Sequence, residues 1–188
     1  MATVIRREGG IGLEVFKLRV AELKKLKLIV GWLSSAKYDD NTPVAGVAAV
    51  QEYGSTSRGI PPRPFMRTTQ DNKREEWKRI VESGVRAILN GSATAFEVME
   101  QLGAKVVADI KITISNISLP LSPVTIALRK IRDDGSYNIG GKLVGQVAAA
   151  IAAGETGPGQ LGDQSYANKD PLRDTGVMIA TLTHEVQS

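Results

Sequence analysis

The stretch Gln51–Gln70, QEYGSTSRGIPPRPFMRTTQ, decides how the chain around it folds. It holds three prolines within four residues, Pro61, Pro62 and Pro64. Each proline fixes its own φ angle and pushes the preceding residue towards an extended conformation. The segment is therefore ordered before it meets a partner, and fixing it loses less entropy than fixing a flexible loop. We interpret it as a connector between two helices and as a docking segment, two compatible roles.

Upstream of this stretch the pattern predicts a helix followed by a strand. Apolar residues recur at helical spacing over 13–26, which predicts an amphipathic helix. The alternation of Leu28, Val30 and Trp32 then predicts a strand that ends near Ser34.

A short helix rich in alanine and valine is predicted over 44–53, directly before the opening stretch. Thr42 is expected to cap it. Pro43 suits its first turn, because an N–H group there would have no partner within the helix and its absence costs nothing. Gly54 stands where a left-handed C-terminal cap is expected.

Downstream, two helices are predicted in succession. The first begins at Thr68 or Thr69 and runs to about Asn90, and the second is capped by Ser92 or Thr94. Two consecutive helices with a short link pack antiparallel as a hairpin.

The facing sides of this hairpin are apolar, and Gly84 among them allows a neighbour to approach closely. The segment 111–120, KITISNISLP, is compatible with a longer second helix or with a switch to a strand, and periodicity does not decide between them.

The remaining chain changes character after one more helix start, Ser122 followed by Pro123. Glycine is dense over 133–170, where the strong element is an alanine-rich helix at about 142–153. We expect 133–170 to be an inserted arm or long loop, since loops of that length are usually functional or disordered.

The C-terminal tail predicts a short helical segment and then a strand in which Leu182, His184 and Val186 alternate. This strand is expected to pair with 26–32. The predicted fold class is α+β, a small and mostly antiparallel sheet flanked by helices that include the hairpin. The core is expected to comprise 1–132 and 171–188.

Composition limits the function. The 188 residues are 42% apolar and 5% aromatic, so the core is expected to consist mostly of Val, Ile, Leu and Ala. No run approaches the ~18 apolar residues of a membrane span, and the N-terminus has no apolar signal core. The chain has no cysteine, which suits a reducing compartment.

Residues that would support catalysis or ligand binding are sparse. His184 is the only histidine, and a hydrolase would depend on that single imidazole. The adjacent acids at 39–40, 75–76 and 133–134 lack facing geometry for glycosidase or two-metal chemistry. The match of GPGQLG at 157–162 to a dinucleotide motif follows a helix and contains Pro158. We expect no catalytic, cofactor-binding or metal-binding residues.

The net charge of +4 is mild, and basic residues concentrate over 17–27 and 58–86. In the second segment acids are interspersed, which is typical of a solvated helix face. Nucleic-acid binding through Arg74, Lys78 and Arg79 is the alternative, and it would give an affinity that falls steeply with salt.

Several segments together resemble the neck or tail-completion proteins of long-tailed bacteriophages. The family pattern VA-x-x-A-x-x-x-E-[FY]-G, followed by P-P-R-P-F-[LM]-R, matches Val44, Ala45, Ala48, Glu52, Tyr53, Gly54, Pro61, Pro62, Arg63, Pro64, Phe65, Met66 and Arg67. The later LSPVTIALRK and DPLRDTGVM are similar to the family's closing motifs. The resemblance covers the chain from about Leu28 to its end. The departure is the 133–170 segment, which replaces a short glycine-rich link.

The resemblance implies an α+β fold and a structural virion protein without catalysis. Such a protein forms a homo-oligomeric ring, sixfold or twelvefold, at the head–tail junction of the virion and is made in the host bacterial cytoplasm. Its implied partners are head connector or portal-adaptor proteins, tail-terminator or tail-tube proteins, and genomic DNA that passes through the lumen. No membrane is implied. A tail terminator that caps the tail tube is the alternative within this class.

We expect the contacts of such a ring to include prolines and exposed cations. Arg63 and Arg67 suit a neighbour's carboxylates, since guanidinium forms bidentate pairs with them. The expected interface residues are Arg58, Pro61, Pro62, Arg63, Pro64, Arg67, Lys142 and Gln146. The expected core anchors of the motif are Tyr53, Gly54, Phe65 and Met66.

Overall fold

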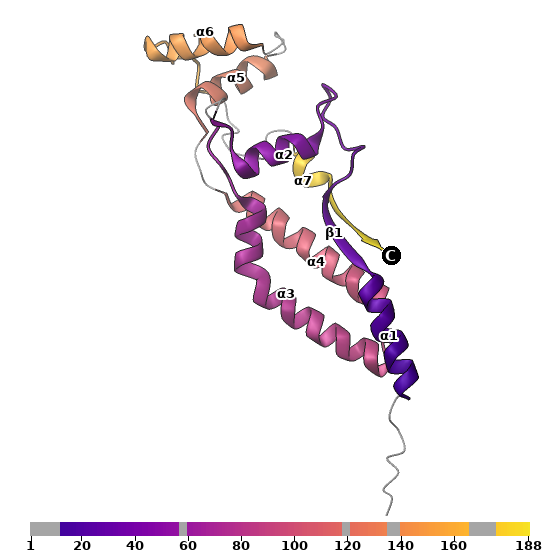
Figure 1. The fold of residues 1–188 in the computed structure, drawn as a ribbon. Coiled ribbons are helices and arrows are strands. Elements are labelled where there is room, and N and C mark those ends of the chain that lie inside the picture. The colour runs from indigo at the N-terminus through magenta and orange to yellow at the C-terminus, as the bar shows by residue number, and fades with distance from the viewer. Residues whose placement is uncertain (1–11, 57–59, 118–120, 135–139, 166–175) are drawn as a thin grey trace, which may run out of the picture. The chain divides into compact units, whose positions relative to one another are not determined.

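The computed structural model describes residues 12–56, 60–117, 121–134, 140–165 and 176–188. The chain divides into two compact units, one formed by Met1–Ser115 with Val177–Ser188 and the other by Asn116–Gly176. The fold is α+β, as predicted, and is mostly helical with a small antiparallel sheet (Figure 1). None of the described helices combines the length and the apolar composition that crossing a bilayer requires.

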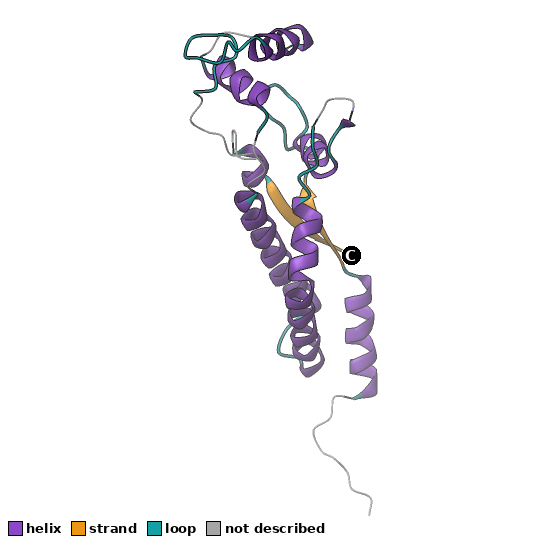
Figure 2. Cartoon of the chain, turned by 90° about the vertical axis from the view of Figure 1, so that its left-hand side faces the viewer, coloured by secondary structure: helices purple, strands orange, loops and turns teal. Residues whose placement is uncertain are grey.

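The sheet of the first unit joins distant parts of the sequence. Strand β1 (Lys27–Trp32) pairs antiparallel with β2 (Leu182–Gln187), so that Lys27 is opposite Gln187 and Trp32 is opposite Leu182. A short helix, α7 (Val177–Ala180), leads into β2. The predicted pairing of the two strands is therefore confirmed, and Figure 2 shows them (orange) among the helices.

Helices α1 (Leu13–Lys25) and α2 (Val44–Tyr53) form where the sequence predicts them. The predicted cap of α2 is wrong: Pro43 occupies the N-cap position, and no side chain caps the helix. The backbone N–H of Thr42 instead donates to Asp40 Oδ1. This Asx-type turn brings the chain into α2 without a threonine cap.

Helices α3 (Phe65–Asn90) and α4 (Ala95–Asn116) form the predicted hairpin. Thr94 Oγ1 accepts the N–H of Glu97, and Glu97 Oε2 accepts the N–H of Thr94, a reciprocal capping box. Of the two predicted caps, the structure therefore selects Thr94. It also resolves the open end of α4, because the helix continues to Asn116 instead of switching to a strand.

Two glycines of the hairpin allow close packing, one between its two helices and one against the sheet. A Cβ added at Gly84 would lie 2.3 Å from Val98 Cγ1, which confirms the close approach predicted there. On α4, a Cβ added at Gly103 would lie 2.2 Å from His184 Cδ2. The imidazole of β2 therefore packs directly on the α4 backbone and brings the sheet against the hairpin.

Phe65, the first residue of α3, lies in the core of the first unit. It is fully buried, and its ring meets Trp32 of β1 edge to face at a centroid distance of 6.0 Å. Trp32 Nε1 donates to the Met178 carbonyl at 2.8 Å. One aromatic pair thus connects β1, α3 and α7, with Val44 and Ile114 also completely buried.

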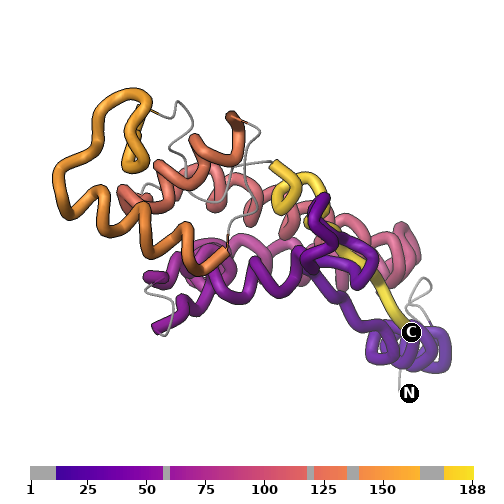
Figure 3. Tube along the Cα trace, turned by 90° about the horizontal axis from the view of Figure 1, so that it is seen from above, coloured from indigo at the N-terminus to yellow at the C-terminus, as the bar shows by residue number. Residues whose placement is uncertain are grey.

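The second unit contains α5 (Pro123–Asp133) and α6 (Gly141–Ala152), both at predicted positions. Ser122 caps α5 by accepting the N–H of Thr125. Figure 3 shows α6 (orange) leading into the loop over 153–165. In that loop the N–H groups of Ser165 and then Gly159 hold the pKa of Asp163 below its usual range. The unit begins at Asn116, so it includes α5 as well as the glycine-rich 133–170 segment.

Replacing Gly103 by alanine is expected to lower the free energy of unfolding by about 1–3 kcal/mol, because its methyl group would displace the His184 ring. The matched control is Gly46→Ala on the exposed face of α2, where an added Cβ meets nothing. That change is expected to stabilise by about 0.5–1 kcal/mol through helix propensity. Urea denaturation measures both, and equal midpoints would contradict the proposed packing.

Candidate interaction surface

Glu52, in the last turn of α2, is a buried carboxylate at the N-terminus of α3. It is 4% exposed and accepts the backbone N–H groups of Met66 at 2.8 Å and Arg67 at 3.2 Å. The first N–H groups of a helix have no partner inside it, and they favour a negative charge. The predicted start of α3 at Thr68 or Thr69 is wrong. This contact explains why the helix begins at Phe65 instead.

Arg67 completes the contact from the outer side. Its Nε donates to Glu52 Oε1 at 2.9 Å, and its Nη2 donates to the Glu52 carbonyl at 2.9 Å. The guanidinium lies 5.1 Å from the centre of the Tyr53 ring. The Arg67 and Tyr53 side chains are both more than half exposed. Arg67 therefore already pairs with a carboxylate of its own chain and keeps one side towards solvent.

Tyr53 corrects an expectation, because it does not anchor the core. It is 70% exposed, and its ring lies beside the Arg67 guanidinium, a cation–π arrangement. The helical periodicity of α2 explains this, since the buried residues of the helix are Val44, Ala48 and Glu52. Tyr53, one position beyond Glu52, points to a different side.

Arg63 corrects a second expectation. It is 4% exposed, its N–H donates to the Gln51 carbonyl at 2.6 Å, and its Nη1 donates to Gln51 Oε1 at 3.0 Å. The side chain therefore ties the proline segment to α2 from inside the unit. It does not offer an exposed guanidinium to a neighbour's carboxylates.

The proline segment between these contacts is closed at its base. Ser55 and Ile60 exchange backbone hydrogen bonds of 2.8 and 3.0 Å. Gly54 has φ +75°, and a Cβ there would lie 2.8 Å from Ile60 O and Pro62 N, so glycine is required. Its ψ of 179° departs from the left-handed cap that was predicted. Residues 51–56 and 60–67 together form what we call the α2–α3 corner.

The other expected interface residues have diverse surroundings. Pro61 and Pro62 are exposed, and Pro64 is half-buried at the N-cap of α3. Met66, expected in the core, is half-buried. Arg58 lies outside the described residues. Lys142 and Gln146 are exposed one helical turn apart on α6, in the second unit.

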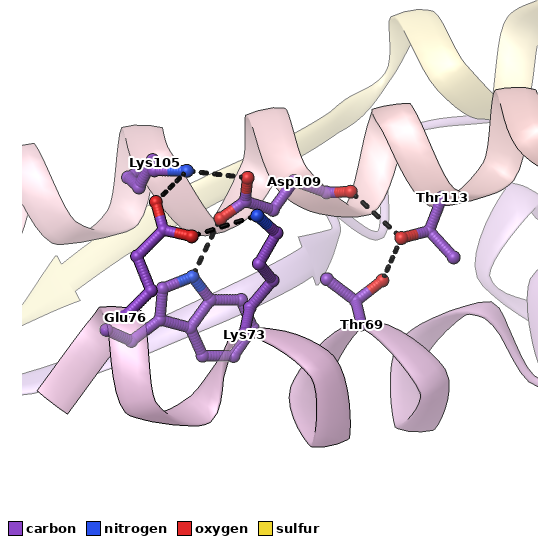
Figure 4. A network of polar contacts seen from close by, with 7 residues as sticks. Thr69, Lys73, Glu76, Lys105, Asp109 and Thr113 are labelled. Carbon is purple, nitrogen blue, oxygen red and sulfur yellow. Dashed lines mark hydrogen bonds and ion pairs between the residues drawn. The ribbon is translucent and has the colours of Figure 1, made fainter.

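A second polar group joins α3 to α4, and we call it the α3–α4 seam (Figure 4). Asp109 is buried and accepts from Trp77 Nε1 at 2.8 Å and from Lys105 Nζ at 2.7 Å. Lys105 also binds Glu76 at 2.7 Å, and Glu76 binds Lys73 at 2.9 Å. One helical turn from Lys73 and Asp109, the hydroxyl groups of Thr69 and Thr113 are hydrogen-bonded at 2.7 Å.

The seam shifts the titration of its members. Hydrogen bonds from Lys105 and then Lys73 lower the pKa of Glu76 to about 2. Asp109 and then Glu76 raise the pKa of Lys105. Each charged group of the seam thus has its counter-charge within the hairpin, and the arrangement serves to fix the register of the two helices.

His184 contacts α4. Its Nε2 lies 3.2 Å from Glu100 Oε2, and the ring covers Gly103. Among the described residues, no three histidine, aspartate or glutamate side chains are grouped as a metal site would require. The imidazole holds β2 on α4.

Sequence reasoning missed Glu52 and Asp109 as organising residues. Glu52 belongs to the motif, but the N–H group that it accepts lies 14 residues further along the chain, at Met66. A signal was available for Asp109, because an acid stands between the apolar residues Val106 and Ile110, four residues after Lys105. An acid on an apolar helix face indicates a buried partner.

Comparison with protein families, with curated proteins and with solved structures gives no match to this chain.

Replacing Glu52 by alanine is expected to destabilise the first unit by about 2–4 kcal/mol, because the N–H groups of Met66 and Arg67 lose a charged acceptor. Glu82→Ala, on the exposed side of α3, is the control and should change stability by less than about 0.5 kcal/mol. Urea denaturation followed by circular dichroism measures both. A loss for Glu52→Ala no larger than the control's would show that the carboxylate does not organise the corner.

Acidification is expected to weaken the α3–α4 seam. The folded pKa of Glu76 is about 2 and its ordinary value is 4.5, so its stabilisation is complete above pH 4.5 and is lost as pH falls towards 2. Glu76→Gln should flatten the dependence of the unfolding midpoint on pH in that window, whereas Glu82→Gln should not. Parallel pH profiles of wild type and Glu76→Gln would refute this assignment.

Proposed function

We propose that the chain is a structural virion protein that forms a ring at the head–tail junction of a long-tailed bacteriophage. In this function it joins the capsid connector to the tail and lines the path of the DNA. The observation that carries the proposal is the α2–α3 corner, where the residues of the motif act together.

Five of the motif positions in the corner have structural roles that depend on one another. Glu52 caps α3 and pairs with Arg67, Gly54 is required by its backbone, and Arg63 ties the loop to Gln51. Phe65 anchors the corner beside Trp32. These contacts make the matching residues one structural unit, and that unit is what we offer in support of the proposal.

The corner also suits a protein that functions by its shape. Its Glu52 and Arg67 pair with each other and Arg63 binds Gln51, while its prolines and Gly54 limit the conformations available to the backbone. Such a segment loses little entropy when neighbours enclose it. Large apolar side chains elsewhere in the first unit are exposed, with Phe96 and Ile112 among them, and a ring would provide surfaces to cover them.

Within the same class, a tail terminator remains the alternative, and the two are distinguished by whether the chain binds a head connector or a tail tube first. Nucleic-acid binding through Arg74, Lys78 and Arg79 is less favoured. These cations are exposed on α3, but Asp71, Glu75 and Glu82 share that face. The mixture weakens the positive potential that phosphate binding needs.

We expect the purified chain to form rings in negative-stain electron microscopy, and antibodies against it to label the collar of virions from the genome that encodes it. Antibodies against a capsid protein serve as the control for position. A chain that is missing from purified virions would refute the proposal. Antibody labelling at the distal tail or on the head alone would refute the proposed location at the neck.

A further inference from the structure

The first two turns of α1, residues 13–18, form an apolar projection that we call the α1 tip. Four of its six residues are large, apolar and well exposed: Leu13 at 65%, Val15 at 42%, Phe16 at 42% and Leu18 at 64%. No residue of α1 is buried. Helical segments that are apolar on several sides are normally covered by protein.

The second half of α1 fixes the tip in place. Arg19 Nη1 donates to the Leu89 carbonyl at the end of α3 at 2.6 Å. Leu23 and Leu26 pack on the cluster of Ile88, Ala95 and Val98. The tip therefore projects from an anchored helix (Figure 1), in an orientation set by the hairpin.

A complementary surface lies on the sheet of the same unit. A hollow of about 70 Å³ there is lined by residues that include Ile29, Gly31, Leu33, Thr183 and Glu185. Gly31 is opposite Thr183, and a Cβ added at Gly31 would meet nothing. Ile29 and Leu33 are exposed beside it. We call this site the sheet hollow, and its exposed Ile29 and Leu33 offer apolar contact to the end of an apolar side chain.

The tip of one chain cannot reach the sheet hollow of the same chain. Only Leu26 separates α1 from β1, and β1 rises from one end of α1 while the tip is at the other (Figure 1). From Leu26 the tip begins about 12 Å away along the helix and Gly31 lies about 17 Å away along the strand. A contact between the two surfaces therefore requires two molecules.

We infer that the α1 tip of one subunit inserts apolar side chains into the sheet hollow of a second copy of this chain. The two surfaces differ, so the contact is heterologous, and repeating it head to tail generates a ring where the rotation closes. The inference rests on the proposed ring and specifies which surfaces form it. Burial of apolar area supplies the driving force.

Cross-linking tests the contact directly because the chain has no cysteine. Lys17→Cys places a thiol on the tip and Glu185→Cys places one on the rim of the hollow, both at exposed positions that leave the apolar residues intact. A short bismaleimide should join the chains when the two variants are mixed and not when either is alone. Lys17→Cys mixed with Ser83→Cys, on the exposed face of α3, is the control.

Blocking the hollow provides the second measurement. Gly31→Leu is expected to lower the association constant by about thirtyfold or more, the effect of removing a central anchor, in sedimentation velocity or light scattering. Its unfolding midpoint should not fall, since the position is open and glycine within a strand is itself unfavourable. Phe16→Ser should act similarly from the other side, whereas Gly46→Leu on α2 should leave association intact.

The outcomes separate this inference from the proposed function. If the wild-type chain forms oligomers but the mixed variants do not cross-link, the tip-to-hollow contact is overturned. The proposed ring would then stand, and the tip would bind some other partner. Cross-links of Lys17→Cys with itself would indicate an isologous contact and also overturn it. A wild-type chain that stays monomeric in solution overturns the inferred contact, while labelling of virions judges the function independently.

Discussion

The carboxylate of Glu52 against the N-terminus of α3 is the contact on which the first unit depends. It satisfies N–H groups of Met66 and Arg67 and pairs with the Arg67 guanidinium. Because these groups are about 14 residues apart in sequence, the intervening segment must close on itself, and the prolines and Gly54 make that closure rigid. The same closure starts α3 at Phe65, whose ring then meets Trp32 of the sheet. One buried charge thus orients α2, α3 and β1 together.

The fold follows from the sequence wherever the cause is local or periodic. The helix starts at Thr94 and Ser122 were predictable because each cap lies within three residues of the group it binds. The pairing of β1 with β2 was predictable because two alternating segments were available to form a sheet. The start of α3, the burial of Arg63 and the exposure of Tyr53 were not predictable. Each depends on a contact with a residue that is distant in sequence, and no local sequence pattern predicts that contact.

The candidate site follows the same division. The sequence identified the α2–α3 corner as important, since prolines and a glycine concentrate there, but it assigned its arginines to a neighbouring molecule. In the structure Arg63 and Arg67 bind Gln51 and Glu52, because a guanidinium near a buried carboxylate or amide is stabilised more by that partner than by water. The corner therefore acts as an internal brace. In the proposed ring, the surfaces left for association would be apolar ones, and these were not apparent from the charge pattern.

In the proposed ring, the brace and the association surfaces would determine the geometry together. The tip and the hollow lie on opposite sides of Leu26, so the angle between α1 and β1 sets the angle between neighbouring subunits. Leu26 is held by its N–H bond to the Leu23 carbonyl and by packing on Ile88, Ala95 and Val98. That cluster belongs to the hairpin, whose register the α3–α4 seam fixes. The number of subunits in the ring would then be a property of the core packing, and a change at Leu26 would alter curvature without touching either contact surface.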